Sequence, residues 1–486
     1  AMKLKFEVLS KTEIEKVHDA SLGVLANTGM KFESERLLEG LAKNGAKVNR
    51  GQKTVLFPRR IVEQAIENNG RLLREGKKLH LLNGVTSEIT EGDGIEAKIS
   101  GGCEKFLDWN SRSIKPASAA QLLRFIRLGE KLPEVGFVGN PIVMRDDLDG
   151  TKISERMRRV KTAALIAKNT RKAGSMEVWN EKEIDLFVEM GIVVRGSRKA
   201  YYEKPCFVTA KETISPLYLD ADAGNILLEF AKRELPCTII PMPITGMSTP
   251  VTMPGNVIIG NAEILGVLTA IQSLYPGSPV GGGTISGIMD MQTTVASFSA
   301  PEAILQDIAI AEVHQSLYGF NYLIGTGYTD AKYPNSQVLA EKTMKFLFTY
   351  LSGRTSYPLG LMNSGSVFSA EQALVDLEIC RNINAHFESK FDFDGLDEIV
   401  KLIGDVGIRG HYLEQEHTLH HFRQNWFPLI FDRTSFISLE QSREEELYDR
   451  AHAKVEELLS PDDFWEIDRD KANAIDDIVR KAESIL

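Results

Sequence analysis

Cysteine is scarce in this sequence, and its spacing is irregular. The four cysteines, Cys103, Cys206, Cys237 and Cys380, lie far apart in the 486-residue chain. Zinc sites built from cysteine usually place paired ligands about two to four residues apart. We therefore expect reduced, mostly buried thiols, no bound metal and a cytoplasmic protein.

The chain also lacks an excess of positive charge, long apolar runs and an apolar leader. Its formal net charge is -10, and no basic stripe interleaved with aromatic residues appears, which argues against nucleic-acid binding. A negative net charge is compatible with a cationic substrate. Because no run of about eighteen apolar residues occurs, we expect no membrane span, and the first residues do not have the composition of a signal peptide.

Glycine, in contrast, is concentrated where strand-like runs end. Three successive glycines, Gly281, Gly282 and Gly283, close one such run just before a long helical segment. Glycines also follow neighbouring runs in the segments 245–248, 325–328 and 363–366. Glycine allows a ligand to approach the main chain closely, so these strand ends are predicted to converge on one site.

A regular alternation of strands and helices predicts the fold class, α/β. Strand-like runs open near residues 136, 171, 205, 236, 279, 321 and 356, at spacings of roughly 31 to 43 residues. Helix-length segments follow them, for example 301–317 and 336–351. Such an array predicts a parallel sheet with right-handed crossovers, and its length favours a closed (β/α)8 TIM barrel over an open sheet. The eighth strand is expected either at 105–109 or after Phe387.

Three regions follow from this reading. Residues 1–115 are predicted to form a mainly helical N-terminal region, with two helices between 11 and 43, Thr12 as a plausible cap, and a helix near 58–69. Residues 116–440 are predicted to form the barrel, and 441–486 a C-terminal helical extension.

Position at the strand ends selects candidate site residues, because barrel active sites lie at the carboxyl ends of the strands. Acidic groups beside aromatic faces suit a cation, although a carboxylate at such a place caps the next helix about as often. No Gly-x-Ser-x-Gly elbow or activated cysteine is present, so a protein nucleophile is not expected. The strand-end candidates are Glu177, Glu212, Met242, Met247, Asp290, Tyr328, Asp330 and Asn363.

Two other patterns carry weaker signals. His417, His420 and His421 have helical spacings that could present two imidazoles to a metal, but no Glu or Cys completes a known pattern, so a structural role is favoured. The glycines 281–283 could cradle phosphate, yet no nucleotide-binding fingerprint accompanies them.

Taken together, these segments resemble the trimethylamine methyltransferase family, in particular its members without pyrrolysine. The resemblance covers about residues 108–433. It is carried by the order and spacing of several segments: Ser175-Met176-Glu177, Gly281 to Thr284, residues 325–332, residues 391–404, His417-Thr418, Arg423, Pro428 and Asp432-Arg433.

The resemblance implies a (β/α)8 methyltransferase that transfers a methyl group from an amine to the corrinoid (cobalamin) of a separate corrinoid protein. In the trimethylamine enzymes a pyrrolysine lies in the barrel, and it would fall near residues 325–335, where this chain has ordinary residues. The expected substrate is therefore a quaternary amine such as glycine betaine, proline betaine or carnitine. A quaternary amine leaves as a neutral tertiary amine, so the protein mainly has to orient it and exclude water.

The resemblance also suggests roles for the candidates, and a homo-oligomer is expected. Trp179 and Tyr328 would offer aromatic faces, while Glu177, Glu212, Asp290 and Asp330 would face the cation. Asn363 and His411 complete the substrate set, and a substrate carboxylate would need a donor such as Lys211, Lys332 or His411. The positions expected to face the corrinoid or the substrate are Gly281, Gly282, Gly283, Gly325 and Gly327.

Two alternatives stay open. One is a cofactor-independent lyase or isomerase on the same barrel, with Glu212 or Asp330 as general base. The other is a betaine-binding or scaffold subunit that docks the corrinoid protein without catalysis.

Overall fold

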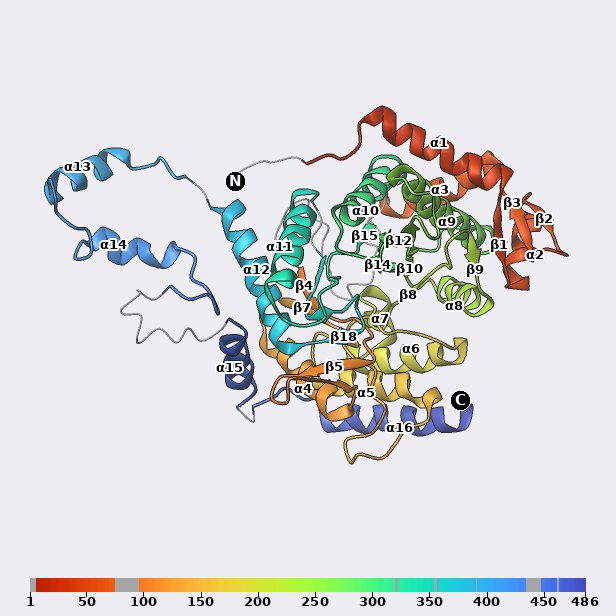
Figure 1. Ribbon diagram of the computed structural model, residues 1–486. Helices are drawn as coiled ribbons and strands as arrows, with labels where there is room; N and C mark the ends of the chain where they lie inside the picture. The colour runs from red at the N-terminus through yellow and green to blue at the C-terminus, as the bar shows by residue number, and fades with distance from the viewer. Residues whose placement is uncertain are drawn as a thin grey trace.

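The computed structural model describes residues 6–74, 96–319, 322–353, 356–389, 391–433, 447–460 and 463–486 (Figure 1). The described chain is a mixed α/β structure in which short parallel strands are surrounded by helices. The run predicted from residue 321 and the extension predicted from 441 both begin outside the described residues.

Two parallel sheets hold the centre of the fold. One has the order β16-β4-β7, formed by Ser356–Pro358, Glu96–Ile99 and Val135–Val138. The other has the order β15-β12-β10-β8, formed by Tyr322–Ile324, Val280–Thr284, Cys237–Ile239 and Thr209–Lys211. Because every neighbouring pair in them is parallel, their carboxyl ends lie on the same side of each sheet.

An extended segment at 173–176 connects the two sheets. Ala173 forms a parallel bridge with Val138 of β7. On its other side, Phe207 N donates to Gly174 O at 2.8 Å, and Met176 N donates to Val208 O at 3.0 Å, just before β8 begins. Backbone pairing therefore runs in one continuous order from β16 through the segment 173–176 to β15.

Both positions predicted for the eighth strand are wrong. The strand that joins the seven predicted runs is β4, which lies between β16 and β7. The segment at 105–109 does contain a strand, β5 (Lys105–Asp108), but it pairs antiparallel with β6 (Ser113–Pro116) and parallel with β18 (Val367–Phe368). After Phe387 the described chain forms helices. The boundary predicted at residue 115 thus separates β4 from the strands with which it pairs.

Helices follow the strands as the sequence predicts, and their apolar faces form one continuous core with the sheets. A short 3-10 turn, Glu155–Met157, precedes α5, and a π-helical turn, His314–Tyr318, extends α10. The helices of this layer are α4 (Ala119–Lys131), α5 (Arg158–Asn169), α6 (Glu181–Arg195), α7 (Arg198–Glu203), α8 (Ala221–Lys232), α9 (Met253–Leu274), α10 (Pro301–Val313), α11 (Ser336–Leu351) and α12 (Ala370–Glu388).

Helix α9 is long and apolar enough by composition to cross a membrane. However, 78% of its most apolar window is buried inside the protein, where it packs against α1, α2, α3 and α10. Packing in the core accounts for its composition.

The N-terminal region contains the predicted helices together with a small sheet. Helix α1 begins after Ser10, whose side chain and that of Glu13 form a capping box, so the cap expected at Thr12 is wrong. Strand β1 pairs with β9 (Tyr218–Leu219) and so ties this region to the rest of the chain. The elements are α1 (Lys11–Asn27), β1 (Met30–Phe32), α2 (Glu35–Lys43), β2 (Lys47–Asn49), β3 (Thr54–Leu56) and α3 (Arg59–Arg74).

Short strands after the parallel sheets build the rim above their carboxyl ends. They are β11 (Ile244–Thr245), β13 (Gly287–Asp290) and β14 (Val295–Ser297) in one sheet, and β17 (Leu361–Met362) beside β18 in another. Because these strands begin only a few residues after β10, β12 and β16, they fix the loops that surround the site.

The C-terminal part has two different characters. Helices α15 (Leu447–Leu459) and α16 (Arg469–Ile485) lie on the body of the protein, with α15 against α12 and α16 against α5 and α6. Helices α13 (Leu396–Val406) and α14 (Glu416–His421), followed by a 3-10 turn Phe422–Gln424, extend away from the body (Figure 1).

Candidate functional site

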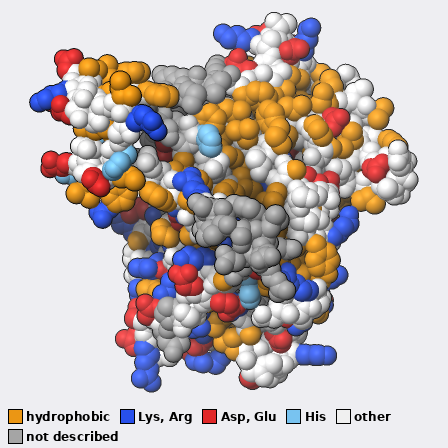
Figure 2. Space-filling model, turned by 60° about the vertical axis from the view of Figure 1, so that its left-hand side comes forward, with side chains coloured by type: hydrophobic (Ala, Val, Ile, Leu, Met, Phe, Trp, Pro, Cys, Tyr) orange, Lys and Arg blue, Asp and Glu red, His pale blue; other side chains and the backbone are white. Residues whose placement is uncertain are grey.

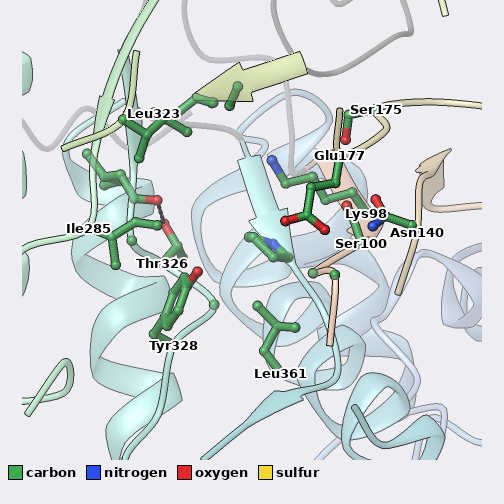
Figure 3. A pocket seen from close by; sticks show the side chains of 18 of the residues that line it. Lys98, Ser100, Asn140, Ser175, Glu177, Ile285, Leu323, Thr326, Tyr328 and Leu361 are labelled. Atoms are coloured by element: carbon green, nitrogen blue, oxygen red, sulfur yellow. Dashed lines mark hydrogen bonds between the residues drawn. The ribbon is translucent and has the colours of Figure 1, made fainter. Parts of the chain in front are cut away.

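A cavity of about 210 Å³ lies at the carboxyl ends of the parallel strands. A cavity of about 150 Å³ in another protein takes up benzene, so this one has room for one small organic molecule. The polar side chains that line it are Lys98, Ser100, Asn140, Ser175, Glu177, Glu212, Thr284, Thr326 and Tyr328 (Figure 3).

Glu177 is positioned by the chain segment that joins the two sheets. Its carboxylate stands over Gly102, where a Cβ atom would lie 3.4 Å from Glu177 Oε2 and 3.5 Å from Asn140 Nδ2. Gly102 also has a φ of 64°, a left-handed conformation that favours glycine. The side chains of Glu177 and Asn140 therefore lie directly against Gly102, a position that the sequence alone did not single out.

Glu212 and Tyr328 complete the acidic and aromatic part of the cavity. Burial raises the pKa of Glu212, and the nearby Lys211 partly offsets that rise. Burial also raises the pKa of Tyr328, with Cys103, Glu212 and Glu177 adding to it. The Tyr328 hydroxyl is therefore neutral at physiological pH, and its ring offers a π face to a cation.

Lys98 is the cation among the described residues that line the cavity. It belongs to β4, where it is paired with Pro358 of β16 and Phe137 of β7. Burial lowers the pKa of its ammonium to about 8, and the carboxylate of Glu96 partly opposes this shift. Within the described chain its Nζ makes no hydrogen bond or ion pair.

Asp307, on α10, holds two of the strand ends in place. Its two carboxylate oxygens accept hydrogen bonds of 2.8 Å from the backbone N–H groups of Ser286 and Gly325. Burial raises the pKa of Asp307, and these hydrogen bonds oppose the rise. Asp307 thereby fixes the backbone after β12 and β15, which leads to Thr326 and Tyr328.

The structure brings together part of the predicted site. Glu177, Glu212, Tyr328, Gly325 and Gly327 all line the cavity. The glycines 281–283 do not, because they pair within β12: a Cβ on Gly282 would meet Tyr322 and His314, and one on Gly283 would meet Leu323. They allow close packing between the strands and their neighbours.

The other predicted carboxylates serve turns. Asp290 is exposed and accepts hydrogen bonds from Gln292 N and the Thr293 hydroxyl. Asp330 accepts them from Phe298 N at 2.9 Å and from the Ser297 hydroxyl. Neither caps the next helix in the way that the alternative interpretation of strand-end carboxylates expected, because the N-caps of α10 and α11 are Ala300 and Asn335.

Several further candidates also lie outside the cavity. Trp179 is 49% exposed, and the Arg159 guanidinium carbon lies 3.5 Å from its ring centroid. Asn363 is in a turn with φ 47° and donates to Ser366 Oγ at 2.8 Å. His411 and Met247 are exposed, and the remaining strand-end or donor candidates Met242, Lys211 and Lys332 are not lining residues.

The histidine cluster and the cysteines can now be placed. His417 and His421 lie on α14 with ring centroids 4.3 Å apart, exposed on the extended segment. No group of three or more His, Cys, Asp or Glu side chains in the described ranges is arranged to hold a metal ion. All four cysteines are buried free thiols, as predicted.

Lys98, Ser100 and Asn140 are polar cavity residues that sequence reasoning missed. The signal for Lys98 was available in the alternating run Glu96 to Ser100, which reads as a strand with polar residues on one face. Its place among the parallel strands depends on pairing that the sequence does not reveal.

Comparisons with known proteins identify the family of this chain. A sequence profile described as trimethylamine methyltransferase (MTTB) matches residues 2–485. The chain belongs to the trimethylamine methyltransferase family. Within this family it is 26% identical over 433 residues to trimethylamine methyltransferase MttB of Desulfitobacterium hafniense strain DSM 10664 / DCB-2, covering 87% of this chain and 84% of that protein.

Two further relatives have names that include quaternary amines. The glycine betaine methyltransferase of Desulfitobacterium hafniense strain Y51 is 25% identical over 459 residues, covering 94% of this chain and 93% of the relative. The proline betaine:corrinoid methyltransferase of Eubacterium limosum is 26% identical over 437 residues, covering 87% of each.

The fold of this family member is similar to a solved structure. The crystal structure of Methanosarcina barkeri monomethylamine methyltransferase (MtmB) aligns with a TM-score of 0.50 at 13% identity, over 94% of this chain and 90% of that one. At this identity the likeness concerns the fold alone.

Proposed function

We propose that this protein transfers a methyl group from a small quaternary amine to the corrinoid of a partner protein. The observation that carries the proposal is the cavity at the strand ends, in which Glu177, Glu212 and Tyr328 surround a space sized for one small cation. Carboxylates and an aromatic face are the groups that recognise a quaternary ammonium, which cannot donate a hydrogen bond.

The residues present suit a reaction in which the protein positions the substrate. The corrinoid, carried by its own protein, supplies the nucleophile that accepts the methyl group, and the electron pair of the broken C–N bond leaves with the neutral amine. Because no proton has to move at nitrogen, neither carboxylate needs to act as an acid. Glu177, Glu212 and Tyr328 bind the cation and orient one methyl group toward the mouth.

The names of the relatives support this proposal and extend the set of possible substrates. They include glycine betaine, proline betaine and trimethylamine enzymes. We favour a quaternary amine, since the segment 325–335 contains ordinary residues. A cytoplasmic location is part of the same proposal, in keeping with four free thiols.

We also propose that the strands close into a (β/α)8 barrel through β15 and β16. This is supported by Gly327, just after β15, where a Cβ would lie 2.7 Å from the carbonyl oxygen of Pro358 in β16. The barrel would then begin at β4, after an N-terminal region that ends before residue 96, and the C-terminal helices would pack outside it.

The experiment is a methylation assay with cob(I)alamin, free or bound to the corrinoid protein, and a panel of glycine betaine, proline betaine, carnitine, tetramethylammonium and trimethylamine. We expect the spectrum of cob(I)alamin to disappear with at least one quaternary amine. Loss of this activity in Glu177→Gln, together with wild-type activity in the matched control Asp290→Asn, would show that the reaction takes place in the cavity. No conversion with any amine would overturn the proposal.

One observation favours a second candidate. The raised pKa of Glu212 is also what a general base in a lyase or isomerase requires. Exchange of substrate C–H for deuterium in the absence of any corrinoid would reveal that activity, and binding without either reaction would indicate a scaffold.

A further inference from the structure

Lys98 enters the same cavity as the acidic groups, and within the described residues its Nζ makes no ion pair. Figure 3 shows Lys98 and Glu177 extending into the cavity, with Tyr328 on the opposite side. Lys98 is half-buried, and an ammonium that is partly withdrawn from water without a counter-charge is costly. Such a group in a ligand cavity calls for an anion that arrives with the ligand.

The two ends of the cavity differ in depth. Lys98 lies within β4, whereas Glu212 follows the last residue of β8 and Tyr328 lies four residues beyond the end of β15. Because these strands run in parallel, the Lys98 side chain starts from the deeper side of the cavity, whereas those of Glu212 and Tyr328 start nearer its mouth. The corrinoid is carried by a separate protein and would approach from outside the cavity of about 210 Å³, so the methyl groups are placed toward the mouth.

On the basis of the proposed function, we propose that Lys98 binds the carboxylate of a zwitterionic amine whose quaternary nitrogen lies between Glu177, Glu212 and Tyr328. This fixes the orientation of the substrate and identifies its class as a betaine. The donors Lys211, Lys332 and His411 lie outside the cavity, which leaves Lys98 as the cation able to reach the ligand among the described lining residues.

The test compares ligands with and without a carboxylate. Binding of glycine betaine, proline betaine and tetramethylammonium is measured by calorimetry in the absence of corrinoid, so that the result does not depend on methyl transfer. We expect Lys98→Gln to lower the affinity for the betaine that the wild type binds by about 10- to 100-fold. Its affinity for tetramethylammonium should stay within about twofold of the wild-type value. Lys98→Arg should restore part of the betaine affinity, and Lys332→Gln is the matched control.

The outcomes separate this inference from the proposed function. Equal weakening of both ligand types in Lys98→Gln, or unchanged betaine affinity, would overturn the role of Lys98 while methyl transfer could still occur. If Lys98→Gln selectively lost betaine binding but the wild type transferred no methyl group, the carboxylate subsite would stand and the methyltransferase proposal would be rejected. A wild type that binds no betaine would reject the subsite.

A second inference rests on a different part of the molecule. Residues 391–428, here called the arm, leave the body after α12 and carry α13 and α14 outward (Figure 1). Figure 2 shows hydrophobic side chains on the surface of this arm. Neither α13 nor α14 contains a buried residue. The large apolar side chains exposed there are Phe391, Phe393, Leu396, Val400, Ile403, Ile408, Leu413, Leu419, Phe422 and Phe427.

The arm is held firmly where it rejoins the body. Leu429 N donates to both carboxylate oxygens of Glu378 at 2.9 Å, and the next residue, Ile430, is buried. Helix α13 has 11 residues, which is too short to be stable alone in water. Its exposed Leu396, Val400 and Ile403 form one apolar face, so another surface must cover it.

We infer that a second copy of this chain covers the arm in a symmetric dimer. Ten apolar side chains at roughly 100 Å² each offer on the order of 1,000 Å², which exceeds the roughly 800 Å² per partner of a standard stable interface. The corrinoid protein has to dissociate after each transfer, whereas this face needs permanent cover. A second copy is present whenever the enzyme is, and twofold symmetry would cover both arms.

Sedimentation equilibrium of the purified chain tests this inference. We expect the mass of a dimer or a multiple of it for the wild type, and the monomer for Val400→Asp combined with Ile403→Asp. Lys401→Glu, on the polar face of α13, is the matched control and should keep the wild-type mass. A monomeric wild type, or an unchanged mass in the double variant, would overturn the inference.

Discussion

Lys342 Nζ donates a hydrogen bond of 2.6 Å to Asp376 Oδ2, and both side chains are 0% exposed. The pair joins α11 to α12, and the same carboxylate oxygen accepts from Gly360 N at 2.7 Å. It therefore connects two outer helices to the backbone between β16 and β17, close to the cavity wall at Leu361.

Removing one member of this pair should destabilise the protein strongly. Lys342→Met would leave the Asp376 carboxylate buried and uncompensated, which costs about 3–5 kcal/mol. Denaturant unfolding of Lys342→Met, Asp376→Asn and the double variant Lys342→Met with Asp376→Leu measures this, and the double variant should lose less than Lys342→Met alone. Glu203→Gln, which breaks the exposed Lys199–Glu203 pair at 3.8 Å, should cost less than about 1 kcal/mol.

Glu177 and Asp330 should respond to substitution in opposite ways. Glu177→Gln removes a charge from the cavity and should lower kcat/KM on the order of tenfold to a hundredfold, with little change in unfolding free energy. Asp330→Asn loosens the turn at Phe298 and should lose about 1–2 kcal/mol of stability and less activity. If Asp330→Asn were the more damaging to turnover and neutral to stability, the structural role of Asp330 in the turn at Phe298 would be wrong.

Gly327→Ala tests the approach of β15 to β16. The added Cβ would lie 2.7 Å from the Pro358 carbonyl oxygen. Because relieving this contact requires a shift of the backbone, we expect the free energy of unfolding to fall by about 1–3 kcal/mol. The control is Gly404→Ala in α13, where nothing lies within 4 Å of the new Cβ and helix propensity predicts a gain of up to about 1 kcal/mol. Thermal unfolding of both variants gives the comparison, and a neutral Gly327→Ala would argue against the closed barrel.

The stability of the protein should depend on pH through Lys98. Its pKa falls from an ordinary 10.5 to about 8 in the folded state, so between pH 8 and 10.5 the unfolded state binds more protons and stability rises with pH. Lys98→Met removes the free-energy cost of keeping a charged ammonium at this position in the folded protein. The variant should be more stable than the wild type by on the order of 3 kcal/mol below pH 8, and the difference should shrink toward pH 10.5.

Denaturant unfolding at several pH values checks this expectation, with Lys332→Met, at an exposed position outside the cavity, as the matched control. A stability difference between Lys98→Met and the wild type that is constant from pH 7 to pH 10 would contradict a depressed pKa of Lys98.

Periodic features of the sequence were sufficient for much of the fold. Helix α11 occupies the predicted range 336–351, and α10 with its π-helical turn covers all of the predicted 301–317 and ends one residue later, at Tyr318. The runs near 136, 236 and 279 contain β7, β10 and β12. These elements were predictable because apolar spacing, prolines at helix starts and glycines at strand ends are local signals.

The strand β4 was not predictable in the same way. Its four residues, Glu96–Ile99, carry two charged side chains and follow the segment 75–95, which lies outside the described residues. The apolar run at 105–109 is a stronger local pattern, yet it became a rim strand. Strand pairing depends on partners far away in the chain, here Pro358 and Phe137, and a local pattern contains no information about them.

The sequence by itself determined the family, the alternation of strands and helices, and the carboxylates Glu177 and Glu212 together with Tyr328, because each follows a recognisable strand end. Only the tertiary structure decided which strand-end residues converge. It placed Asp290 and Asp330 in turns and Trp179 against Arg159, and it brought Lys98 into the cavity from a strand that pairs with residues almost 40 positions later and 260 positions later. The physical reason is that a side chain's direction follows from local geometry, whereas its neighbours are set by the pairing and packing of distant segments.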